Sequence, residues 1–80
     1  MKTKIRDIKD AEAIVSVAEK YKDILTVDVI YWRYRVDACS IVAVSGLVGS
    51  EVAIEPNTTD QELRDRFEQE LSEKLNMERE

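Results

Sequence analysis

The chain has 80 residues, which is enough for one small domain with a single thin core. Apolar residues make up 44% and charged residues 36%, the balance of a folded globular protein rather than of a disordered one. The net charge of −5 argues against nonspecific nucleic-acid binding, which needs an excess of lysine and arginine, and against adhesion to an anionic membrane. Histidine is absent, so the chain lacks the usual general base near neutral pH and the commonest metal ligand.

The location of the protein is indicated by what the sequence lacks. It has no apolar run of about 18 residues, so we expect no membrane insertion. Acidic residues at Asp7, Asp10 and Glu12 interrupt any apolar signal-peptide core. The single cysteine, Cys39, cannot form an internal disulfide and fits a reducing compartment. We therefore expect a cytoplasmic protein.

The chain begins with a short edge strand over residues 2–6, followed by a helix. Asp7 is a good N-cap residue, and Asp10 then falls at the third helical position, close to a capping-box arrangement. Apolar residues recur at spacings of three and four, at Ala11, Ile14, Val15, Ala18 and Tyr21. This spacing predicts an amphipathic helix from about Ile8 to Tyr21.

Two strands follow this helix. Residues 24–30 are rich in β-branched side chains, and bulky and polar residues alternate from Trp32 to Ala38. No glycine or asparagine is present at residues 31–33 to form a regular hairpin loop. We therefore predict a less regular turn with Trp32 at or near its tip.

A second, short helix is predicted to start at Ser40. A serine directly before an apolar run can cap a helix, because its hydroxyl accepts a bond from a free backbone N–H. The run consists of Ile41, Val42, Ala43, Val44 and Leu47. Gly46 and Gly49 are both suitable residues for the end of this helix.

The last elements are a strand and a long helix. Residues 50–55 form the strand, which Pro56 stops. Residues 59–62 match a capping box, and Leu63, Phe67, Leu71 and Leu75 follow as an i, i+4 apolar stripe. The order β-α-β-β-α-β-α predicts an α+β fold, an open-faced sandwich with a four-stranded antiparallel sheet and three helices on one face. Residues 1–80 are expected to form a single domain.

This order, together with the stretch Val36-Asp37-Ala38-Cys39-Ser40-Ile41, resembles HPr, the histidine-containing phosphocarrier protein of the bacterial sugar phosphotransferase system. HPr-like sequences typically read V-x-A-K-S-I here, followed by small and apolar residues. The resemblance covers roughly the whole chain and implies an HPr-like fold and no enzymatic activity. It also implies partners among the phosphotransferase-system proteins or HPr kinase.

By this resemblance, the phosphate-carrying histidine of the family's H-x-R-P-type motif corresponds to Asp7. Of that motif only the positive charge of the arginine is kept, by Lys9. The resemblance therefore implies a degenerate member that cannot carry phosphohistidine. Asp7 could accept a phosphoryl group as an acyl phosphate, although only Asp10 and Lys9 are near in sequence to support that chemistry. The alternative is a helix cap. We expect no metal and no cofactor.

The regulatory serine of HPr, which a dedicated kinase phosphorylates, corresponds to Ser40. A phosphate at a helix N-terminus is well accommodated, and an ordinary N-cap is the alternative. The lysine that precedes this serine in the family is Cys39 here. Cys39 is either a reactive thiol, if the helix N-terminus lowers its pKa, or a small buried residue.

Two sets of residues are candidates for docking partner proteins. Ile41, Val44 and Leu47 lie on or beside the short helix, which docks partners in the family; the alternative is core packing. Trp32 belongs to the only aromatic cluster, next to two arginines, and is typical of an interface anchor. Its alternative is to cap the open end of the sheet.

The expected function is that of a regulatory or protein-binding HPr-family member, switched through Ser40, which binds proteins and not nucleic acid. We expect a monomer or weak dimer. The alternative is a structural or assembly module that acts through protein–protein contacts unrelated to sugar transport.

Overall fold

The computed structural model describes residues 1–79, which form four strands and three helices. The elements are β1 (Lys2–Lys4), α1 (Ile8–Tyr21), β2 (Val27–Tyr31), β3 (Tyr34–Asp37), α2 (Ile41–Ser45), β4 (Glu51–Pro56) and α3 (Gln61–Arg79). The predicted α+β class and element order are confirmed. Within these residues, no helix has the length and apolar character needed to cross a membrane.

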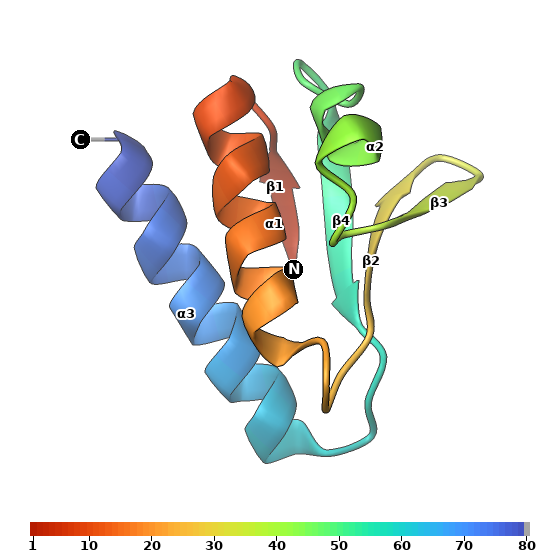
Figure 1. The fold of residues 1–80 in the computed structure, drawn as a ribbon, viewed down its shortest axis with the longest axis vertical. Helices are drawn as coiled ribbons and strands as arrows, with labels where there is room; N and C mark the ends of the chain where they lie inside the picture. Colours follow the sequence, from red (N-terminus) through yellow and green to blue (C-terminus); the bar gives the residue numbers. More distant parts are fainter. Residues whose placement is uncertain (80) are drawn as a thin grey trace.

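The sheet has the strand order β1-β4-β2-β3, and every neighbouring pair is antiparallel. The helices α1, α2 and α3 all lie on the same side of this sheet (Figure 1). The other side carries no element within residues 1–79 and is called the open face below.

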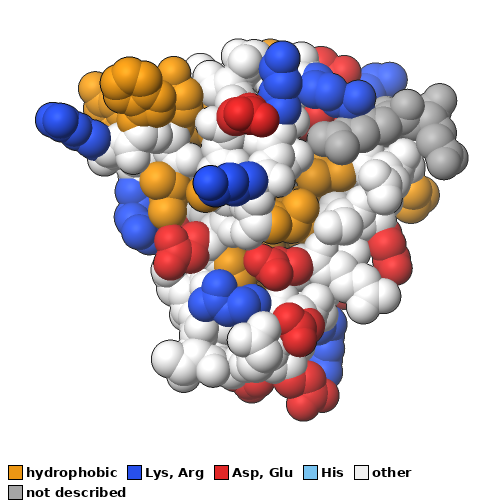
Figure 2. Space-filling model, turned by 180° about the vertical axis from the view of Figure 1, so that it is seen from behind, with side chains coloured by type: hydrophobic (Ala, Val, Ile, Leu, Met, Phe, Trp, Pro, Cys, Tyr) orange, Lys and Arg blue, Asp and Glu red, His pale blue; other side chains and the backbone are white. Residues whose placement is uncertain are grey.

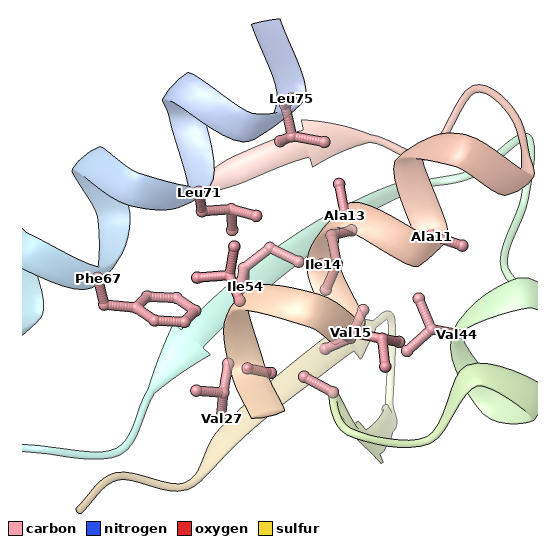
Figure 3. Close-up of a cluster of buried hydrophobic side chains, with 14 of the residues drawn as sticks. Ala11, Ala13, Ile14, Val15, Val27, Val44, Ile54, Phe67, Leu71 and Leu75 are labelled. Carbon is pink, nitrogen blue, oxygen red and sulfur yellow. The ribbon is translucent and has the colours of Figure 1, made fainter. Parts of the chain in front are cut away.

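Strand alternation directs one set of side chains toward the helices. Val29 of β2 pairs with Ile54 of β4, and both are buried. The apolar stripe of α3 meets α1 above them, and Figure 3 shows Phe67 and Leu71 of α3 close to Ile54. The core therefore lies between the sheet and a layer made of α1 and α3.

The start of α1 follows the prediction in part. Asp7 is the N-cap, and its Oδ1 accepts a hydrogen bond from the backbone N–H of Asp10 at 3.1 Å. The Asp10 carboxylate differs from a capping box, because its Oδ2 accepts from the backbone N–H of Arg6 at 3.0 Å and from Arg6 Nε at 3.2 Å. A buried carboxylate is thus paired with a cation, which offsets the cost of burying its charge.

The β2–β3 hairpin is tighter than predicted. Tyr31 pairs directly with Tyr34, so Trp32 and Arg33 alone form the loop. A loop of this length needs positive φ, which glycine or asparagine usually supplies. Here Trp32 has a φ of 57°, in the left-handed region that costs energy for a residue with a Cβ atom. The predicted place of Trp32 at the tip of the turn is confirmed, whereas the expected irregularity was wrong, because strand pairing closes a two-residue loop with a bulky residue in this conformation.

The remaining boundaries lie close to the predictions. Ser40 is the N-cap of α2, with its Oγ accepting from the N–H of Ala43 at 3.3 Å, and α2 ends at Ser45 with Gly46 as its C-cap. The N-cap of α3 is Asp60 rather than Thr59, because the Asp60 Oδ1 accepts from the N–H of Leu63 at 3.2 Å.

Candidate protein-binding surface

The short helix α2 exposes apolar side chains to solvent. Val42 is 80% exposed, Ile41 41% and Val48, just beyond the helix, 40%. No charged residue occurs between Asp37 and Glu51, although charged residues make up 36% of the chain. We call Ile41, Val42 and Val48 the α2 face.

The geometry of a short helix explains which residues are exposed. Val44 is 0% exposed and points toward Val15 of α1 (Figure 3). Each residue turns an α-helix by about 100°, so Val42 lies about 200° from Val44 and faces solvent. Ile41 lies about 60° from Val44 and stays at the edge of the contact.

The predicted docking residues therefore fall into buried and exposed ones. Val44 cannot contact a partner and belongs to the core, which corrects the prediction that included it in the docking set. Leu47 is half-buried and packs against the core. Ile41 is available, and Val42 and Val48 replace Val44 as the more exposed apolar residues.

The structure does not bring Asp7 and Ser40 together. Asp7 caps the first turn of α1. Cys39, which precedes Ser40, lines a groove with Lys22 and Leu25, just beyond the last turn of α1. Asp7 and Ser40 thus cap two different helices, α1 and α2.

Asp7 is exposed and acts as a helix cap. Its closest acidic neighbour in sequence, Asp10, is turned into the protein and bound to Arg6. The arrangement therefore fits the capping role, since Asp10 does not stand beside the Asp7 carboxylate to form a phosphate-accepting pair.

Cys39 lies in surroundings that keep its thiol protonated. Partial burial raises the pKa of Cys39, and the negative charges of Asp37 and Glu19 raise it further, while Lys22 opposes them. Reactive cysteines have a lowered pKa, so Cys39 lacks the electrostatic environment of a nucleophile.

Trp32 stands apart from α2, at the tip of the β2–β3 hairpin. Its side chain is 84% exposed and lies near Tyr31, with ring centroids 6.2 Å apart. It lines a groove on the open face, together with Lys2, Ile30 and Ala53. Sequence reasoning identified Trp32 but missed this groove, since Lys2 and Ala53 are far from Trp32 in the chain.

Comparison with family models, with curated proteins and with solved structures gives no significant match to this chain. The HPr resemblance therefore depends on the residues between Val36 and Ile41 and on the order of the elements.

Proposed function

We propose that this protein is a non-enzymatic, HPr-like binding module that docks partner proteins through the α2 face. It does not carry phosphate on histidine, because the chain contains none. The observation that carries the proposal is the exposure of Ile41, Val42 and Val48 within a segment that has no charge. The family resemblance adds the class of partner, the proteins of the phosphotransferase system and HPr kinase.

An uncharged apolar surface favours a partner surface of the same kind. Single exposed apolar residues are ordinary on protein surfaces, but a contiguous group typically marks an interaction site. The α2 face offers no charge for recognition, so binding must come from burying Val42 and its neighbours against apolar side chains. The helix itself is held in place by Val44, which keeps this surface fixed before a partner arrives.

Ser40 supplies a switch for this surface. Its hydroxyl caps α2 and is partly exposed. A phosphate there would add about two negative charges beside Ile41, close to the acidic residues around Cys39. A phosphate next to an apolar contact would have to lose hydrating water when a partner binds, and this desolvation costs free energy. Phosphorylation is therefore expected to weaken docking through the α2 face.

The first experiment is the intact mass of the protein after incubation with HPr kinase and ATP, in parallel with enzyme I and phosphoenolpyruvate. We expect one phosphoryl group with the kinase and none with enzyme I. Ser40→Ala should remove the added mass, and Asp7→Asn should leave it unchanged. Phosphate gained from enzyme I and lost in Asp7→Asn would show acyl-phosphate transfer instead.

The docking surface is tested by calorimetric titration with HPr kinase. Val42→Asp should weaken binding at least tenfold, because a carboxylate would be buried at the contact. Met77→Asp is the matched control, since Met77 is 70% exposed on α3, outside the α2 face. Equal affinities for the two variants would contradict docking through α2.

The alternative function, an assembly module unrelated to sugar transport, is favoured by the exposed ring of Trp32. It predicts that Ser40→Ala and Val42→Asp leave partner binding unchanged, whereas substitutions at Trp32 abolish it.

A further inference from the structure

A groove on the open face is lined by Lys2, Ile30, Trp32, Glu51, Val52 and Ala53. We call it the Trp32 groove. Strand register places its members side by side, since Ala53 of β4 pairs with Lys2 on one side and with Ile30 on the other. Ile30, Glu51 and Ala53 alternate along their strands with the buried Val29, Val52 and Ile54, so their side chains point away from the helices. Val52 borders the groove but is itself buried.

Three cations lie in or next to this groove in the fold: Lys2 lines it, Lys4 pairs in strand register with Glu51, and Arg33 follows Trp32 in the hairpin loop. Lys2, Lys4 and Arg33 are exposed, and none has an ion pair with another residue within 1–79. Arg35, farther along the same face, contrasts with them, because it is paired with Asp28 and Glu55.

Figure 2 shows the open face directly. Lys and Arg side chains are more frequent in its upper part, and acidic side chains are more frequent lower down. Hydrophobic side chains gather at the upper left, over the β2–β3 hairpin. A chain with a net charge of −5 thus presents a locally basic, partly apolar region.

Trp32 is costly in this position. Its φ of 57° is a conformation that glycine adopts more easily, and its side chain is 84% exposed. Neither burial nor backbone preference accounts for a tryptophan here. Strained backbone of this kind is concentrated at binding sites, and tryptophan and arginine are the residues that most often anchor protein contacts.

We propose that the Trp32 groove binds an acidic peptide segment of a partner protein, with an apolar side chain of that segment against the Trp32 ring. The carboxylates of the peptide would face Lys2, Lys4 and Arg33. A peptide suits the site better than a nucleic acid because Glu51 lines the groove. A peptide can place its apolar residue beside Glu51 and its carboxylates beside the cations, whereas a nucleic acid brings a continuous row of phosphates that Glu51 would repel. This surface is separate from the α2 face and does not depend on the function proposed for it.

Trp32 is the only tryptophan in the chain, so its fluorescence reports on the groove directly. The probe is a capped six-residue peptide with two glutamates on each side of a leucine–phenylalanine pair. We expect a saturable blue shift of the emission, because the ring leaves water, and an affinity that falls at least tenfold as salt is raised. The same peptide with lysines in place of the glutamates should cause no shift.

Charge reversal at the groove gives the decisive comparison. The double variant Lys2→Glu, Lys4→Glu and the single variant Arg33→Glu should each weaken peptide binding at least tenfold, and circular dichroism checks that they fold. Lys22→Glu makes the same change of charge at an exposed residue on the loop after α1 and should bind as the unmodified protein does.

Three results of the ligand titrations would overturn the proposal. They are the absence of a saturable shift, equal binding of the lysine peptide, and a shift produced only by oligothymidylate. An emission that changes with protein concentration alone would also overturn it, because a second copy of the chain would then occupy the groove. Val42→Asp should keep full peptide binding, which separates this result from the test of the α2 face.

Discussion

The hydroxyl of Tyr21, at the end of α1, donates a 3.0 Å hydrogen bond to the Glu70 carboxylate of α3. The same carboxylate accepts from Lys20 Nζ at 3.0 Å, and the Tyr21 ring meets Phe67 edge-on with centroids 5.5 Å apart. One carboxylate therefore joins two neighbouring residues of α1 to α3, beside an aromatic contact in the core. This set of contacts fixes the position of one helix along the other.

Glu70 makes the stability of the fold depend on pH. The hydrogen bond from Lys20 lowers the pKa of Glu70 most, and the bond from Tyr21 lowers it further, against the opposing effect of partial burial. A carboxyl whose pKa is lower in the folded state stabilises the fold above its ordinary pKa, and this stabilisation is lost as pH falls through the folded value. Glu70→Gln should therefore lower the free energy of unfolding by about 1 kcal/mol near neutral pH and make no difference in strong acid.

Urea unfolding over a series of acidic to neutral pH values measures this effect. Glu12→Gln is the control, because Glu12 is exposed on α1 and has no ion pair within residues 1–79. Parallel pH curves for Glu70→Gln and the unmodified protein would show that the pair with Lys20 contributes nothing.

Trp32→Gly should stabilise the protein. Relief of the left-handed backbone gains about 1–3 kcal/mol and the added flexibility of glycine in the unfolded chain costs about 0.5–1 kcal/mol, so a net gain of about 1 kcal/mol is expected. Little burial is lost, because the side chain is 84% exposed. Thermal unfolding followed by circular dichroism gives the comparison.

Arg33→Gly is the matched control for that substitution. Arg33 is the other residue of the loop, and its φ is not positive. Glycine at residue 33 increases the conformational entropy of the unfolded chain but relieves no backbone strain in the folded one, so the protein should lose stability. Destabilisation by both substitutions would mean that the Trp32 backbone is not under strain.

Val44 and Val42 offer a second matched pair, two residues apart on α2. Val44→Ala should cost about 2 kcal/mol, because it removes buried methyl groups that face Val15. Val42→Ala should change stability by less than about 0.5 kcal/mol, because the side chain is exposed. Chemical unfolding of both variants measures the difference. Equal losses of stability would contradict the packing in which Val44, and not Val42, faces α1.

The sequence was most informative for elements whose structure depends on local residue pattern rather than on contacts with other elements. The long periodic pattern of α1 gave its bounds, and Asp7 was correctly predicted as its N-cap. The short helix α2 was predicted less fully, because Ile41, Val42 and Val44 are all apolar and contact with α1 alone decides which of them is buried. A helix of little more than one turn has too few residues to show an apolar face by spacing.

The hairpin and the groove were beyond sequence reasoning for a different reason. The φ of Trp32 is imposed by pairing of Tyr31 with Tyr34, which overrides the preference of the residue itself. The groove requires the strand order, since Lys2 and Ala53 become neighbours only through pairing of the first and last strands. The uncharged stretch between Asp37 and Glu51, in contrast, is visible in the sequence and marks the α2 face.

The place of β4 in the sheet has a consequence for how the chain is made. Within residues 1–79, β1 is hydrogen-bonded to β4 and to no other strand, and β4 is also the second neighbour of β2. β1 is synthesised before β4 and therefore waits for this strand partner until residues 51–56 follow it, whereas β2 and β3 are joined by two residues and can pair early. Closure of the sheet is thus a late event in synthesis, and a chain cut before Glu51 would keep the hairpin but lose the strand that unites it with β1.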